Sequence, residues 1–501
     1  MRLALIMMIL LVCCRPVYTR SSYTSTSCIY ELAAYSIECG QLTVPENRQS
    51  SSGSIQLAVV IIHSIAEHPA PDPVVYLAGG PGGSSTAYTE GLAQTWLRPF
   101  LRQRDVILVD QRGTGASTPN LACDEYSRVI IDQISVLPPS ARAMLQAQAA
   151  ALTACHERLA AQGIDTSAYT SAESAADLDD LRQALHIESW NLLGVSYGTR
   201  LALTALRDHP TGIRSVILDS VYPPQVDVFT DVYANGERAR QMVFAACAND
   251  PACAAAYPDL EARFWQLIAR LNASPVTVSA QINGRERDFV WAGDVVYSIM
   301  FLWLYDIHDT TFVPYYVDLL WQGKYDDQSL LRAALDAELW TISVSVGMYM
   351  SVQCGEERPA SLAEERRALF HTYPRLTSLL RHDLWMSDLG DAMCRQWQPT
   401  PPPVLENQPI VSDVPALVLS GTFDPITPPA WAVLAAETLP QAQILTIPEI
   451  GHGVIRSSVC VAEIAAAYLG DPAAPVASSC VKDIPRFSFY KLSQDASASG
   501  L

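Results

Sequence analysis

The stretch NLLGVSYGTRLAL, residues 191–203, decides the fold of this chain: an apolar run enters Gly-Val-Ser-Tyr-Gly and continues with helical spacing. A strand that turns sharply into a helix is the arrangement that lifts a serine hydroxyl clear of the backbone as a nucleophile. Gly194 and Gly198 leave room where strand and helix approach closely. Small residues at such a turn also serve packing alone. Ser196 is therefore a catalytic candidate only if a base, an acid and an oxyanion site exist elsewhere.

Short buried strands recur along the chain and alternate with helical segments. Strands are expected at 55–62, 74–77, 104–110 and 215–220, and the segments PALVLSGTFD and AQILTIPEIGHG supply two more. Strands that alternate with helices form a mostly parallel sheet with helices on both faces. The sequence therefore predicts an α/β fold.

Residues 222–408 interrupt this alternation. They contain long, aromatic-rich helical runs such as DVVYSIMFLWLYDI and lie between two proline-rich joints, YPPQ and PTPPPV. This block predicts a mostly helical cap inserted after the strand at 215–220. The sheet-containing core then has two parts, 20–221 and 409–501, behind an N-terminal leader at 1–19.

The composition limits the class of protein. Of the 501 residues, 49% are hydrophobic and 17% are charged, which favours a well-packed enzyme over a disordered chain. The formal net charge of −19 argues against nucleic acid and anionic membrane as partners, because both need a basic face. Charged residues, proline or glycine interrupt every later apolar run, so no stable membrane span is expected. The sequence gives no indication of oligomeric state.

The N-terminus MRLALIMMILLVCCRPVYTR resembles a signal peptide, because its apolar run is too short to span a bilayer. It predicts a secreted or extracytoplasmic protein, with cleavage after Thr19. Lipid attachment at Cys14 is an alternative, although the preceding cysteine makes a poor attachment motif.

Ten cysteines remain after the leader, and an exported protein would oxidise them. Closure of short loops favours the pairs Cys28–Cys39, Cys123–Cys155, Cys247–Cys253, Cys354–Cys394 and Cys460–Cys480. A metal site is the rival interpretation, but the sequence has no C-x-x-C pair outside the leader and no H-E-x-x-H. Neither a metal nor a cofactor is predicted.

His452 is the candidate base. Of nine histidines it alone follows a strand directly and stands between two glycines, in PEIGHGV. Asp424, in LSGTFDPITP, is the preferred acid, because it completes the chain order Ser, Asp, His of this architecture. Asp219 is the competitor, because it also ends a strand of the sheet.

The oxyanion site should combine two backbone N–H groups. One belongs to Tyr197, the residue after the nucleophile, and the other to the AGGPGGSS loop. Gly80 is the candidate there, because Pro81 has no N–H to donate; a plain glycine turn is the alternative. In the DQRGTGAS loop, Asp110 and Arg112 are expected to pair and brace the floor of the site.

The motifs together resemble one family. They are ECGQLTVPENR, YLAGGPGGSS, VDQRGTGAS, DLDDLRQALHIESWNLLGVSYGTRLA, SVILDSVYPP, LVLSGTFDPITP and GHGV. The set is similar to the proline iminopeptidase family of α/β-hydrolase peptidases, and within it to the secreted tripeptidyl aminopeptidase-like branch. The likeness covers most of the mature chain and is weakest in the cap. Ala78 departs from the histidine that proline iminopeptidases usually carry before GGPG, which favours the secreted branch.

The resemblance implies an α/β-hydrolase fold and a serine exopeptidase that acts on peptides with a free N-terminus. Ser196, Asp424 and His452 would form its triad. A carboxylesterase or lipase with the same triad is the alternative, and the sequence does not fix how many residues are released.

An aminopeptidase must bind a charged α-amine, and acidic cap residues are the natural means. Glu356 and Glu357 in CGEERP are the candidates, because the proposed disulfide of Cys354 would hold them near the site. A solvated acidic turn is the alternative interpretation, and Glu237 is a further candidate.

Overall fold

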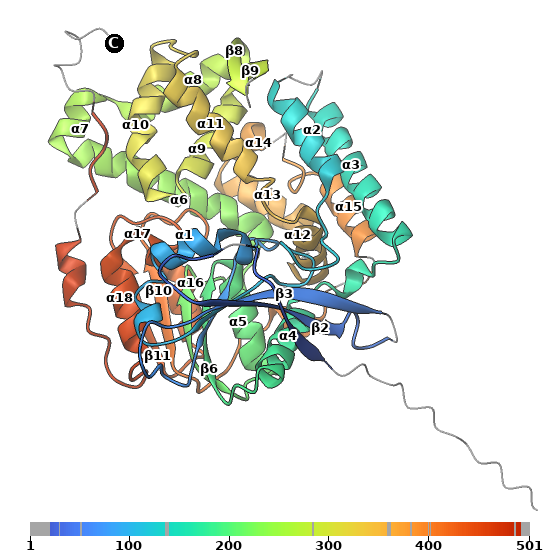
Figure 1. Ribbon diagram of the computed structural model, residues 1–501. Helices are drawn as coiled ribbons and strands as arrows, with labels where there is room; N and C mark the ends of the chain where they lie inside the picture. Colours follow the sequence, from blue (N-terminus) through green and yellow to red (C-terminus); the bar gives the residue numbers. More distant parts are fainter. Residues whose placement is uncertain are drawn as a thin grey trace, which may run out of the picture.

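The computed structural model describes residues 21–491, except residues 30, 51–52, 136–139, 283–284, 358–361, 381–382, 399, 401 and 485–486. The expected leader and Cys14 lie outside the described residues. Figure 1 shows a sheet flanked by helices, with a separate layer of helices above one edge of the sheet.

Nine strands form one sheet in the order β1-β2-β3-β5-β4-β6-β7-β10-β11. Their bounds are β1 Ser22–Thr26, β2 Ile37–Pro45, β3 Ser54–Ile62, β4 Val74–Leu77, β5 Val106–Val109, β6 Trp190–Val195, β7 Ile213–Asp219, β10 Ala416–Gly421 and β11 Ala442–Ile447. The pairs β1–β2, β2–β3 and β3–β5 are antiparallel, and every pair from β5 to β11 is parallel. The predicted mostly parallel α/β sheet is confirmed.

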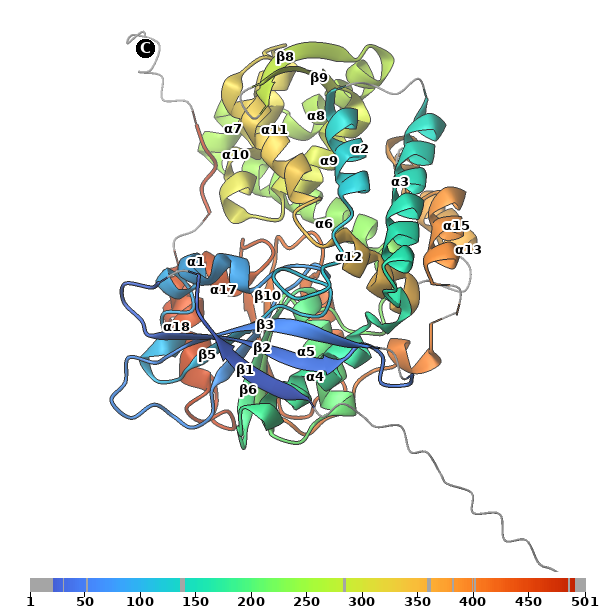
Figure 2. The ribbon, with the colours of Figure 1, turned by 45° about the vertical axis from the view of Figure 1, so that its right-hand side comes forward.

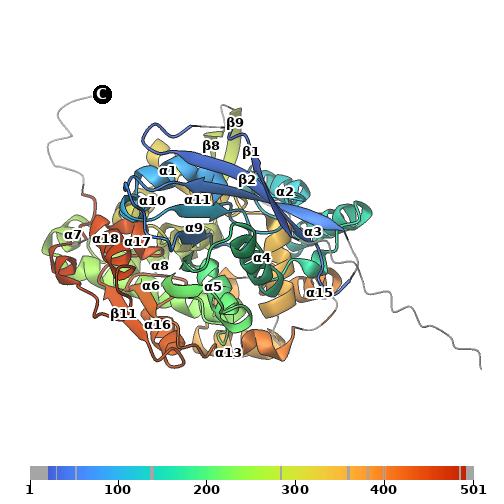
Figure 3. The ribbon, with the colours of Figure 1, turned by 60° about the horizontal axis from the view of Figure 1, so that its bottom comes forward.

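Helices cover both faces of this sheet, because successive strand side chains point to opposite sides. Leu192 of β6 packs with α4 (Ser171–Ala184), α5 (Tyr197–Asp208) and α16 (Pro429–Ala436). Leu193, the next residue, packs instead with α1 (Thr89–Gln94) and α18 (Val459–Tyr468). The short α17 (Val454–Ser457) precedes α18, and Figure 3 shows α17 and α18 apart from α4 and α5.

The block between β7 and β10 forms a layer with its own hydrophobic core. Its helices are α6 Val228–Asn249, α7 Pro251–Ala256, α8 Leu260–Ala273, α9 Gly293–Trp303, α10 Ile307–Trp321, α11 Gln328–Trp340, α12 Val346–Val352, α13 Leu362–Thr372, α14 Leu376–Leu379 and α15 Asp388–Trp397. A hairpin of β8 (Val276–Ile282) and β9 (Arg285–Trp291), which the sequence analysis did not anticipate, joins them.

Two helices from the first part of the chain also belong to this layer. The helices α2 (Asp124–Ser135) and α3 (Ala141–Ala161) follow β5, yet α2 packs against β9 and α3 against α15. Figure 2 shows both helices beside the inserted block rather than beside the sheet. We call α2, α3 and the elements from α6 to α15 the cap layer. It therefore draws on two segments of the chain, not on one insertion.

All five predicted disulfides are present: Cys28–Cys39, Cys123–Cys155, Cys247–Cys253, Cys354–Cys394 and Cys460–Cys480. They are distributed over the core and the cap layer. Within the described residues, no helix has the length and apolar character needed to cross a membrane.

Candidate active site

Ser196 stands at the turn between β6 and α5, as predicted. Its φ of 56° and ψ of −126° are strained for a residue with a side chain, and this strain is typical of functional turns. A Cβ atom at Gly198 would overlap the carbonyl oxygen of Leu77, and one at Gly194 would overlap the backbone of Gly198. Only glycine therefore allows helix, turn and strand to approach this closely.

His452 and Asp424 form a buried pair. His452 Nδ1 lies 2.9 Å from Asp424 Oδ2 and 3.1 Å from Oδ1. Asp424 also accepts hydrogen bonds from the N–H groups of Ile426 and Thr427 and from the Thr427 hydroxyl, at 2.7–2.9 Å. Burial alone would raise the pKa of Asp424, but the charge of His452 and these hydrogen bonds outweigh it and lower that pKa. The ionised carboxylate keeps a proton on Nδ1 and leaves Nε2 free to accept one.

Asp219, the competing acid, has a different partner. Its two carboxylate oxygens accept hydrogen bonds from the N–H groups of Val454 and Ile455, each at 2.9 Å. Burial raises the pKa of Asp219 to about 6. The side chain therefore holds the start of α17, just after His452, and Asp424 alone of the two bonds to the imidazole.

Ser196 and His452 open on the same cavity, which has a volume of about 1030 Å³. Its wall combines loops at the carboxyl edge of the sheet with residues of the cap layer. In the described part of the chain no hydrogen bond joins the Ser196 hydroxyl to the His452 ring. Catalytic hydrogen bonds are often long in the unliganded state and tighten when substrate binds.

The oxyanion candidates lie beside the nucleophile. Gly79 and Gly80 line the cavity, and a Cβ at Gly79 would stand 2.9 Å from the Ser196 Cβ. Among the described residues, neither the N–H of Gly80 nor that of Tyr197 donates to an acceptor. Two unused N–H groups near one serine suit a developing oxyanion.

Asp110 supports the Gly80 loop without Arg112. It accepts hydrogen bonds from the N–H groups of Ser85 and Thr86, at 2.7 and 3.0 Å. Arg112 instead forms a two-point bond with Asp177, with both distances at 2.8 Å. The predicted Asp110–Arg112 pair is therefore wrong. A buried guanidinium binds best to a carboxylate that can accept two parallel N–H···O hydrogen bonds, and Asp177 does so here.

The expectation for the amine-binding glutamates needs correction. Glu356 and Glu357 lie in a π-helical turn (Gln353–Glu357), are 1% and 5% exposed, and do not line the cavity. Glu357 Oε1 is 2.7 Å from Arg200 Nη2, and Glu356 accepts hydrogen bonds from the N–H and hydroxyl of Ser171. Glu356 is therefore hydrogen-bonded inside the protein, whereas Glu357 has the ion pair with Arg200 and no hydrogen bond to its carboxylate oxygens among the described residues.

Glu237, the further candidate for the amine, is also occupied. It is 2.5 Å from Arg240 Nη2 and accepts a 2.7 Å hydrogen bond from the Tyr297 hydroxyl. Its exposed fraction is 6%, and it does not line the cavity.

Two other carboxylates of the cap layer do line the cavity: Glu338 on α11 and Asp383 before α15. Asp383 accepts hydrogen bonds from the Tyr233 hydroxyl at 2.5 Å and from the Trp385 N–H at 2.8 Å. Glu338 has no hydrogen bond or ion pair through its side chain among the described residues, and burial raises its pKa to about 7. The sequence analysis missed Glu338 because an isolated acid on an amphipathic helix is usually solvated, and no sequence pattern marked Asp383.

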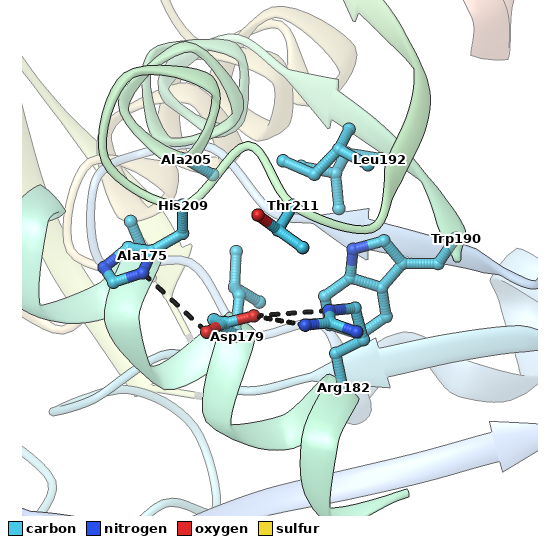
Figure 4. A pocket seen from close by; sticks show the side chains of 10 residues that line it. Ala175, Asp179, Arg182, Trp190, Leu192, Ala205, His209 and Thr211 are labelled. Carbon is cyan, nitrogen blue, oxygen red and sulfur yellow. Dashed lines mark hydrogen bonds and ion pairs between the residues drawn. The ribbon is translucent and has the colours of Figure 1, made fainter. Parts of the chain in front are cut away.

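A second hollow lies between α4 and the α5–β7 connection, remote from these groups (Figure 4). Its volume of about 10 Å³ has room for one water molecule at most. In Figure 4, Asp179 lies between Arg182, at 2.8 Å, and His209, at 3.8 Å. This second hollow therefore has no space for a substrate.

Comparisons with known proteins bear on the fold rather than on the site residues. Residues 72–254 match the family described as alpha/beta hydrolase fold, and residues 383–480 match the family described as TAP-like protein. The serine protease Hip1 of Mycobacterium tuberculosis is 24% identical over 88% of this chain and 87% of its own length. The tripeptidyl aminopeptidase of Streptomyces lividans is 31% identical over 38% of this chain and 36% of its own length. A proline iminopeptidase of Arabidopsis thaliana is 24% identical over 38% of this chain and 43% of its own length.

Proposed function

We propose that this chain, an enzyme with the α/β-hydrolase fold, is a serine hydrolase with a TAP-like C-terminal region that removes short segments from the free N-termini of peptides. The observation that carries the proposal is the shared cavity. It holds Ser196 and the Asp424-bound His452 together with an unpartnered carboxylate on the cap layer.

The reaction follows from the positions of the side chains. Ser196 Oγ attacks the scissile carbonyl while His452 Nε2 takes the hydroxyl proton, and Asp424 stabilises the resulting imidazolium. The N–H groups of Gly80 and Tyr197 bind the oxyanion. His452 then returns the proton to the leaving amine, which departs with a new N-terminus. Water attacks the acyl-enzyme by the same route and releases the N-terminal segment.

Recognition of the substrate amine is assigned to Glu338, assisted by Asp383. A half-buried carboxyl group without a partner is costly when ionised, and an ammonium group would stabilise its charge. Glu356 and Glu357 are less suited to this role, because neither lines the cavity and both carboxylates face Arg200 inside the protein.

The five disulfides favour an extracytoplasmic location, because an oxidising compartment is where such bonds form and persist.

The test compares a tripeptide anilide that has a free N-terminus with its N-acetylated form. We expect the free-amine form to be hydrolysed and the acetylated form to lose at least about tenfold in kcat/KM, because a charge-assisted hydrogen bond is lost. A carboxylesterase would treat both alike and prefer ester substrates. Equal rates for the two anilides would contradict the exopeptidase.

Ser196→Ala provides the control for the chemistry. We expect its turnover to fall by about 10⁴-fold or more, with an unchanged melting temperature. Retained turnover would remove Ser196 from the mechanism.

A further inference from the structure

The cavity carries charge of opposite sign on its two walls. Glu338 and Asp383 belong to the cap layer, whereas Arg456 belongs to α17 on the core. Arg456 is the one lysine or arginine among the described residues that line the cavity. It lies four residues after His452, beside the reacting groups.

The Arg456 guanidinium is largely unused. Its Nη2 donates a 3.2 Å hydrogen bond to the His452 carbonyl, and it forms no ion pair within the described residues. The side chain is exposed and folds back over Gly453, where φ is +75°. Asp219, the buried carboxylate of this region, is occupied by the Val454 and Ile455 N–H groups. An arginine has five N–H donors, so most of those of Arg456 have no partner among the described residues, and the side chain lines the cavity.

Arg456 shares its wall with an aromatic pair. The rings of Tyr76 and Trp96 meet edge to face at 5.2 Å, and both residues line the cavity. Apolar surface beside an unpaired guanidinium suits the end of a peptide, whose side chains would pack on the rings.

We propose that Arg456 binds the C-terminal carboxylate of a short peptide substrate. The inference rests on the proposed exopeptidase function. If the substrate amine lies at the acids of the cap layer, the leaving peptide extends toward the core wall, where its carboxylate meets the guanidinium as a planar, two-point partner. A cavity of about 1030 Å³ is at the upper end of ligand pockets and accommodates a peptide of a few residues.

The experiment uses unblocked peptides of three to eight residues, each as a free acid and as a C-terminal amide. We measure kcat/KM for each pair with the full chain. The wild type should favour the free acid about tenfold at the best length, and the preference should fade as the peptides lengthen. The formal net charge of −19 would by itself favour the amide, so the expected sign is opposite to that of general electrostatics.

Variants then locate the effect. Arg456→Gln should bring the acid-to-amide ratio to about one or below, and Arg456→Lys should retain part of it. The acid-to-amide ratio is the readout, because the variants also lose the hydrogen bond from Arg456 to the His452 carbonyl. That loss should slow the hydrolysis of both substrates equally and therefore cancels in the ratio. Arg332→Gln is the matched control: the side chain of this arginine is 84% exposed, lies 3.6 Å from Asp336 and does not line the cavity, so the ratio should stay unchanged.

Two outcomes would overturn the proposal. One is a wild-type acid-to-amide ratio near one at every length, which needs no variant to fold. The other is a ratio that survives Arg456→Gln. The tripeptide anilide has no carboxylate, so its hydrolysis tests the exopeptidase separately. If the anilide is cleaved while acid and amide are equal, only the role of Arg456 fails.

Discussion

The nucleophile and the acid–base pair are held by different parts of the molecule. Ser196 is fixed within the core, by the glycines around its turn and by a 3.0 Å hydrogen bond from its N–H to the Asp219 carbonyl. The loops of Asp424 and His452 are also held by the cap layer. Arg238 of α6 donates to the carbonyls of Thr422 and Asp424, at 2.8 and 2.5 Å.

The cap layer touches the histidine loop as well. The His452 N–H donates to the Tyr305 carbonyl at 2.9 Å, and the two rings meet edge to face at 5.3 Å. The comparison shows that the cap layer is more than a cover for the cavity. It supplies backbone contacts to the loops of the acid and the base, whereas the backbone hydrogen bond that holds Ser196 comes from the core.

Among the variants that test this comparison, the largest loss of activity should come from Asp424→Asn, which acts on the acid–base pair. The amide cannot hold the His452 tautomer that accepts the serine proton, so we expect kcat to fall by about 10³–10⁴-fold. Asp219→Asn is the paired variant. It weakens two hydrogen bonds to the start of α17, so thermal denaturation should show a lower melting temperature and a much smaller loss of kcat. A reversed pattern would make Asp219 the catalytic acid.

Glu338→Gln separates the substrate-binding role of the cap layer from its bracing role. We expect KM for the free-amine anilide to rise about tenfold at pH 8 with little change in kcat. Because burial raises the pKa of Glu338 to about 7, the carboxyl group is mostly neutral at pH 6 and ionised at pH 8. The wild-type KM should therefore decrease as the pH rises from 6 to 8. In the variant, KM should not depend on pH over this range.

The same variant has a stability consequence with a fixed sign. A raised pKa in the folded state means that folding favours the neutral carboxyl group, and this stabilisation is lost as pH rises through 7. Glu338→Gln should therefore raise the melting temperature relative to wild type more at pH 8 than at pH 5. An equal shift at both values would contradict the assigned burial.

Arg238→Met removes the brace between the cap layer and the Asp424 loop. We expect kcat to fall about fivefold to tenfold while KM changes less, because the loop loses two hydrogen bonds and the acid is less well positioned. Arg270→Met is the matched control. Arg270 also donates to two carbonyls, those of Leu320 and Trp321, but within the cap layer. It should lower stability without lowering kcat.

The smallest effect on activity is expected for Glu356→Gln. The variant weakens the buried contacts with Ser171 and Arg200, so urea unfolding should show a loss of about 2 kcal/mol. The KM for the free-amine anilide should stay within about twofold of wild type. A tenfold rise in KM would restore the original assignment of this glutamate to the amine.

Much of the site could be predicted because its residues follow strands. Ser196, Asp424 and His452 each come directly after a strand or shortly beyond one, and parallel strands deliver their carboxyl ends to one edge of a sheet. The sequence predicts that edge without any knowledge of packing. Asp424 and His452 do meet there, at 2.9 Å. The disulfide pairs were favoured, though not fixed, by loop closure, since each closes a loop of 40 residues or fewer.

The amine-binding carboxylates could not be predicted in the same way. Glu356 is 185 residues from Ser171, its hydrogen-bond partner, and no local pattern reports that contact. Glu338 was overlooked because its sequence neighbourhood is that of an ordinary amphipathic helix. The sequence analysis also did not predict that α2 and α3 belong to the cap layer, because both helices precede the predicted insertion by many residues.

The sequence by itself indicated the mostly parallel sheet, the serine turn and the order of the three candidate catalytic residues, and short-loop closure favoured the disulfide pairs without fixing them. Local spacing encodes strand ends, tight turns and short loops. Only the tertiary structure decided which carboxylates face the cavity and which are neutralised inside the protein. The free energy of a buried charge depends on its partners, and those partners come from distant segments that meet only when the chain has folded.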